Sequence, residues 1–135
     1  MELARMAAIE WHEGLNVGMA FMDDDHAEAA RLINTMAASA GPERIQALRH
    51  FIDHCREHFA REEAMMAKTG FFAQGCHAEE HSRVLAELDG VLARLLAGDG
   101  QDAYFATALP DWLMNHRNTM DLVTAQFARS AGYTG

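Results

Sequence analysis

Apolar residues recur at intervals of three and four along most of this chain, which is the spacing of amphipathic α-helices. The run in residues 43–67 is clear, with apolar positions at Ile45, Leu48, Phe51, Ile52, Cys55 and Phe59. A second run in residues 74–96 places one apolar side along Val84, Leu85, Leu88, Val91, Leu92, Leu95 and Leu96. Helices are therefore the predicted elements, and the turn residues between the runs set their ends.

Four helices are predicted, at roughly 23–39, 43–67, 74–96 and 102–129. Asp23 or Asp24 suits the start of the first helix as an N-cap or first-turn residue. The breaks between helices fall at Gly41-Pro42, Thr69-Gly70 and Gly98-Asp99-Gly100. Pro110 lacks a backbone donor, so it predicts a kink or a fresh start inside the fourth helix.

Long helices with short connections favour an all-α fold, an up-down-up-down antiparallel four-helix bundle. Residues 1–22 are predicted to form an irregular N-terminal arm, because Gly14 and Gly18 interrupt its apolar residues. We expect one domain over residues 1–135, with the bundle at about 23–129.

The composition narrows the class of protein. The chain has 135 residues, half of them apolar, and a formal net charge of −9. This charge disfavours nucleic acid or an anionic membrane as a partner. No apolar run is long enough to span a bilayer, and the N-terminus lacks the apolar core of a secretion signal, so a cytoplasmic location is expected. Cys55 and Cys76 are then expected to be free thiols.

Five histidines and two carboxylates fall on the predicted helices with spacings that suit metal binding. His58 and Glu62 are four residues apart, as are His77 and His81, so each pair shares one helix face. The full candidate metal set is His26, His58, Glu62, His77, His81, His116 and Asp121. Imidazole together with carboxylate suits iron, with manganese or zinc as alternatives.

Asp121 lies five residues after His116, which is about 140° around a regular α-helix. We therefore predict a π-helical distortion between them, because a π-turn brings positions five apart onto one face.

The ligand count suits two iron ions with unequal coordination. In one distribution, His77, His81 and His116 bind the first iron, and His26 and His58 bind the second. Glu62 and Asp121 then bridge the two, with a hydroxide as third bridge. The first iron has six ligands and the second has five, so one position is open to a small molecule such as dioxygen.

At these residues the chain resembles the hemerythrin family, specifically its bacterial single-domain members. The stretches that carry the resemblance are Trp11 to Gly18, Met22-Asp23 with His26, His58 to Glu63 with Met66, His77 to His81, and Trp112 to His116 with Asp121. The resemblance implies an oxo- or hydroxo-bridged non-haem di-iron site that binds dioxygen reversibly. It also implies an apolar pocket over the open iron, for which Phe59, Trp112 and Leu113 are the candidates.

Four positions depart from the family pattern. Arg117 stands where an apolar residue usually borders the dioxygen pocket, so it joins the candidate pocket residues: its guanidinium either turns outward or brings charge and water to the site. His54 stands where Tyr is frequent, Asp25 where Gln is common, and His12 where a small polar residue is usual.

Three other functions were weighed. A zinc protease is disfavoured because Ala78, where the HExxH motif needs Glu, follows His77. A ferritin-like oxidase uses Glu-x-x-His pairs, which are absent from this sequence. An oxygen or redox sensor would act through a protein partner that the sequence does not identify. The predicted function is that of a dioxygen carrier, store or delivery protein and not an enzyme, with the sensor as the alternative.

Overall fold

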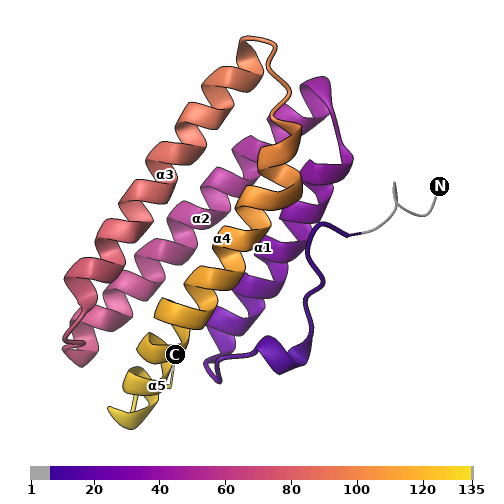
Figure 1. Cartoon of the computed structure of the whole chain (residues 1–135). Coiled ribbons are helices and arrows are strands. Elements are labelled where there is room, and N and C mark those ends of the chain that lie inside the picture. The colour runs from indigo at the N-terminus through magenta and orange to yellow at the C-terminus, as the bar shows by residue number, and fades with distance from the viewer. Residues whose placement is uncertain (1–6, 135) are drawn as a thin grey trace.

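Four helical segments run alternately up and down in the computed structural model, which describes residues 7–134 (Figure 1). They are α1 (Ala20–Ala38), α2 (Gly41–Thr69), α3 (Gln74–Leu96) and a composite fourth segment. The predicted all-α antiparallel four-helix bundle is confirmed. Residues 1–6, on which the prediction about a secretion signal rests, lie outside the described residues, as does Gly135.

The composite fourth segment contains two π-helical turns. In order it comprises η3 (Tyr104–Ala108), α4 (Leu109–His116), η4 (Arg117–Asp121) and α5 (Leu122–Ser130). The predicted π-distortion between His116 and Asp121 is confirmed by η4. Pro110 lies in the first turn of α4, directly after η3, so the helix makes the predicted fresh start where a backbone donor is missing.

The first helix begins earlier than predicted. Its N-cap is Met19, and the backbone N–H of Asp23 already donates to the Met19 carbonyl. The N-cap is therefore neither Asp23 nor Asp24, but Asp23 lies in the first turn of the helix, the other role predicted for it. The Asp23 carboxylate instead accepts from the backbone N–H groups of Val17, at 2.6 Å, and Gly18, at 3.2 Å. Asp23 thus fixes the turn between arm and helix, and Gly18 supplies the positive φ of 85° that this turn requires.

The second helix ends as predicted, because Gly70 adopts the left-handed C-cap conformation with φ 71°. Its N-cap is Ala40, so it starts before residue 43, with Pro42 in the first turn. Cys55 and Cys76 are free, as expected. Among residues 7–134, no helix is both long and apolar enough to cross a membrane.

Two apolar clusters fill the interior at different levels of the bundle. The larger comprises eighteen buried residues, including Ile33, Phe51, Val84, Leu88 and Leu109. The smaller comprises Val17, Met19, Met22, Met65, Ala125 and Ala128. On α1 and on the fourth segment, the candidate metal residues fall between positions of the two clusters, whereas on α3 they lie to one side of the larger cluster. The fold therefore encloses a polar layer between two apolar ones, where unpaired charge is costly.

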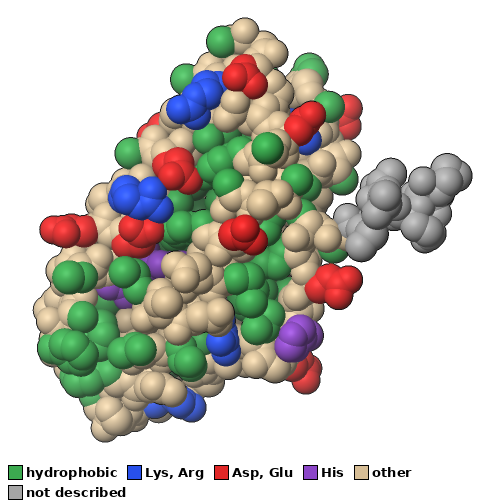
Figure 2. Space-filling model, viewed as in Figure 1, with side chains coloured by type: hydrophobic (Ala, Val, Ile, Leu, Met, Phe, Trp, Pro, Cys, Tyr) green, Lys and Arg blue, Asp and Glu red, His purple; other side chains and the backbone are tan. Residues whose placement is uncertain are grey.

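Apolar side chains also reach the surface at one end. Figure 2 shows them gathered where α2 passes into α3. Phe72 is 81% exposed there and Val123 is 42% exposed. Both border a hollow of about 220 Å³ whose lining includes the free Cys76 and the imidazole of His77.

Candidate metal centre

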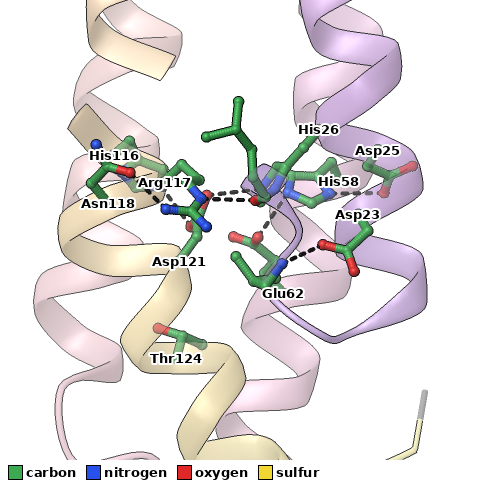
Figure 3. Close-up of polar contacts among 12 residues, drawn as sticks. Asp23, Asp25, His26, His58, Glu62, His116, Arg117, Asn118, Asp121 and Thr124 are labelled. Atoms are coloured by element: carbon green, nitrogen blue, oxygen red, sulfur yellow. Dashed lines mark hydrogen bonds and ion pairs between the residues drawn. The ribbon is translucent and has the colours of Figure 1, made fainter. Parts of the chain in front are cut away.

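All seven candidate ligands converge in the polar layer. His26 comes from α1, and His58 and Glu62 come from α2. His77 and His81 come from α3, and the fourth segment supplies His116 and Asp121. Each of the seven is at least 94% buried. The i, i+4 pairs share a face as predicted, and η4 turns Asp121 toward the same interior as His116 (Figure 3).

The ligand atoms form two groups that could each hold one metal ion. Glu62, His77, His81, His116 and Asp121 make the larger group, and the smaller consists of His26, His58 and Glu62. Within each group, one potential ligand atom per residue lies within 4.8 Å of all the others. The histidines divide three and two, as the ligand count from the sequence supposed.

Each carboxylate faces both groups. Glu62 Oε2 lies 2.7 Å from His58 Nε2, while Oε1 lies 3.1 Å from His81 Nε2. Asp121 Oδ2 lies 2.9 Å from His26 Nε2, while Oδ1 lies 3.1 Å from the Nε2 atoms of both His77 and His116. One oxygen toward each histidine group is the arrangement of a carboxylate that bridges two metal ions.

The buried polar atoms of this layer are better placed to bind metal ions than to form hydrogen bonds with one another. Within the described chain, both Glu62 oxygens, Asp121 Oδ1, His81 Nε2 and both His26 nitrogens have no hydrogen-bond partner. Several lie at ion-pair distance without the geometry of a hydrogen bond. Such orphaned atoms are rare in native interiors and call for an explanation, such as an ion. The residues present therefore fit a pair of metal ions.

The charges of the layer are strongly coupled in the metal-free protein. Burial alone would lower the pKa of His58, but the nearby charge of Glu62 and the hydrogen bond to Asp25 raise it to about 10. Burial and the Asp121 charge act to raise the pKa of Glu62, yet the imidazoles of His58 and His81 at ion-pair distance lower it to about 2. The carboxylates are thus ionised, and a metal ion must displace the proton of His58.

Three imidazoles are oriented through their outer nitrogens. Nδ1 of His58 lies 2.7 Å from Asp25 Oδ2, and Nδ1 of His81 lies 2.9 Å from Glu63 Oε2. Nδ1 of His77 lies 2.8 Å from the buried hydroxyl of Thr124. Such partners fix the tautomer that leaves Nε2 free for a metal. This role of Asp25, Glu63 and Thr124 was not predicted, although Asp25 and Glu63 adjoin candidate ligands.

Two aromatic rings stack on two of the three histidines of the larger group. The ring of Phe59 stacks on His81, with centroids 3.9 Å apart and planes within 4°. The ring of Trp112 stacks on His116 at 4.7 Å and 14°, and its Nε1–H donates to Glu80. These contacts restrict both imidazoles and exclude water from one side of the centre.

A small cavity of about 20 Å³ adjoins the smaller histidine group. His26 and His58 line it, and so do three of the four residues predicted for a pocket, Phe59, Trp112 and Leu113. The candidate ligands His116 and Asp121 line it too. The remaining lining residues were not predicted for a pocket, namely Asp25, Ala29, Phe51, His54 and Cys55. Burial, with the charge of Glu62, raises the pKa of Cys55 to about 12, so its thiol stays neutral and extends the apolar wall.

Arg117 is the exception among the predicted pocket residues, because it does not line this cavity. Its Nε–H donates to the Leu15 carbonyl at 2.8 Å, and a terminal nitrogen donates to the Asn16 carbonyl at 3.4 Å (Figure 3). Of the two orientations predicted for Arg117, the structure shows the outward one, which places the guanidinium outside the pocket. The arm offers carbonyl acceptors outside the bundle, and these hold the guanidinium away from the apolar cavity.

The fold and this layer define a four-helix-bundle protein with a buried, histidine-rich site for two metal ions. A family model described as the hemerythrin HHE cation binding domain matches residues 17–127. The chain is 34% identical to a bacteriohemerythrin of Ralstonia nicotianae, over 94% of this chain and 93% of that protein. It is 33% identical to myohemerythrin-1 of Phascolopsis gouldii, over 82% and 87% of the two chains.

Solved structures agree with these similarities. A crystal structure of a hemerythrin mutant superposes with a TM-score of 0.82 at 25% identity, covering 91% of this chain and 98% of that one. The chain belongs to the hemerythrin family.

Proposed function

We propose that this protein binds dioxygen reversibly at a di-iron centre and serves as a dioxygen carrier, store or delivery protein. In this proposal His77, His81 and His116 bind one iron, His26 and His58 bind the other, and Glu62 and Asp121 bridge them. The division of the histidines and the two-faced carboxylates support this assignment. Family membership supports a cation-binding centre of this type.

The observation that carries the proposal is the small apolar cavity beside His26 and His58. These two histidines form the group with fewer ligands, so the open coordination position belongs to their iron. About 10–15 Å³ of such space holds one water molecule, so a cavity of about 20 Å³ suits one diatomic molecule. Its apolar walls favour neutral dioxygen over a charged or strongly hydrated ligand.

The residues around the cavity have separate tasks. Phe51, Cys55 and Leu113 exclude water, and Phe59 and Trp112 hold the imidazoles of His81 and His116 in place. Ferrous iron would supply the electrons that dioxygen takes up on binding.

The test is the visible absorption spectrum of iron-loaded protein that is reduced without air, exposed to dioxygen and then degassed. A charge-transfer band that appears with dioxygen and disappears on degassing is expected. Immediate conversion to a ferric form that degassing does not reverse would contradict reversible binding and favour a sensor or redox role.

A further inference from the structure

His58 is connected to the protein surface through two charged side chains. Asp25 Oδ2 accepts from His58 Nδ1 at 2.7 Å, and the same oxygen accepts from the Arg61 guanidinium (Figure 3 shows Asp25 beside His58). The guanidinium also lies over the ring of Phe21, 5.7 Å from its centroid. An imidazole, a carboxylate and a guanidinium therefore form a chain from the smaller histidine group to solvent.

This arrangement distinguishes His58 from His77, His26 and His81. His77 has a neutral hydroxyl as its outer partner, and His26 Nδ1 has none within residues 7–134. His81 has the carboxylate of Glu63, but this side chain is 42% exposed, against 13% for Asp25. Water screens the charge of Glu63 more strongly, so the charge of Asp25 acts more strongly on its imidazole.

The charge of Asp25 bears on the metal through the imidazole. A histidine that binds metal through Nε2 keeps a proton on Nδ1, and an anionic acceptor draws that proton away and makes the ring a stronger electron donor. A stronger donor stabilises ferric iron more than ferrous iron. The positive charge of Arg61 opposes this effect, because it neutralises part of the charge on Asp25.

We propose that Asp25 and Arg61 act as an opposed pair that sets the donor strength of His58, and with it the preference of the open metal position for ferric over ferrous iron. This inference rests on the proposed di-iron function and deepens it. Asp25 and Arg61 are positioning residues, since neither is a ligand.

The experiment compares midpoint potentials of iron-loaded wild-type protein, Asp25→Asn and Arg61→Gln. Asparagine keeps an oxygen for His58 Nδ1 and removes only the charge, so the potential should rise. A tenfold change in the ratio of ferric to ferrous affinity corresponds to about 59 mV for a one-electron couple. Arg61→Gln should lower the potential, by less because this side chain is exposed. Autoxidation should slow in Asp25→Asn and quicken in Arg61→Gln.

Control variants come from α2, the helix that carries Arg61. Asp53 and Arg56 form an ion pair within this helix, and Arg56 is 54% exposed, against 53% for Arg61. Asp53→Asn and Arg56→Gln thus change the net charge equally without touching a candidate ligand. A second readout needs no iron: zinc affinity, by chelator competition, should fall about tenfold in Asp25→Asn. It should not fall in Arg61→Gln.

Opposite shifts that exceed those of the controls would establish the pair. Potentials that equal those of the controls, or that move in the same direction in both variants, would overturn it while leaving the di-iron function intact. Failure of wild-type protein to bind iron would overturn the proposed function itself. Arg61 is exposed, so its variant should fold and keep the test informative if Asp25→Asn loses stability.

Discussion

Replacing Thr124 with valine tests whether the outer partners of the histidines support the metal centre. Thr124 is 1% exposed, and its hydroxyl lies 2.8 Å from Nδ1 of His77, which is 2% exposed. Valine has nearly the same shape, so packing should change little. The Nδ1–H of His77 then loses its acceptor, at a position where both side chains are at least 98% buried.

The expected magnitude follows from this burial. A buried donor without a partner costs about 1–3 kcal/mol in the free energy of unfolding, and this loss should appear in the metal-free protein. A metal ligand that loses its outer partner typically binds metal about 10–100-fold more weakly. This corresponds to about 1.4–2.8 kcal/mol, so the zinc-loaded variant should lose more stability than the metal-free variant.

Urea unfolding of the metal-free and zinc-loaded proteins measures both quantities, and chelator competition gives the zinc affinity directly. Thr119→Val is the control, because Thr119 is exposed and its hydroxyl donates to a backbone carbonyl of its own helix. This control should stay within about 0.5 kcal/mol of the wild type. If Thr124→Val behaves like Thr119→Val in both metal states, the argument about His77 is refuted.

Three further predictions concern the arm, the cavity and the protons of the site. Arg117→Leu should speed chymotrypsin cleavage near Leu15, because the arm loses the guanidinium that binds its carbonyls, while autoxidation should not change. Leu113→Ala should cost about 2–5 kcal/mol of stability and speed autoxidation, because it opens the cavity wall to water. Zinc binding at pH 8 should release about one proton from His58, whose pKa of about 10 lies above its ordinary 6.5. Because folding raises the pKa of His58, its protonated form stabilises the metal-free protein. This contribution is complete below pH 6.5 and is lost as the pH rises through about 10.

Each of these predictions has an outcome that would contradict it. Faster autoxidation in Arg117→Leu, with an unchanged cleavage rate, would show that Arg117 acts in the cavity and not on the arm. Unaltered autoxidation in Leu113→Ala would show that this side chain does not exclude water from the iron. Zinc binding without proton release, measured in weakly buffered solution, would mean that His58 is neutral before metal arrives.

Much of the helical framework and of the ligand grouping could be predicted from local spacing. The pairs at i and i+4 define a helix face regardless of what the helix packs against. The π-turn of η4 was predictable because Asp121 could not otherwise share a face with His116. The role of the seven residues as ligands stays a prediction, although the structure brings them together.

The remaining features depend on contacts between distant parts of the chain. Asp23 has the residue type of an N-cap, but the arm presents two backbone N–H groups that it accepts instead. Arg117 turns outward because carbonyls of the arm lie within its reach, about a hundred residues earlier in the sequence. Thr124 and His77 meet only across two helices, and no local pattern marks such a pair.

The most direct test of the central claim is the uptake and release of dioxygen by metal-free protein reconstituted with ferrous iron under anaerobic conditions. The account predicts two iron ions per chain and one dioxygen taken up per pair, with full recovery of that dioxygen when the solution is degassed. Fewer than two irons, or uptake that degassing does not reverse, would contradict it.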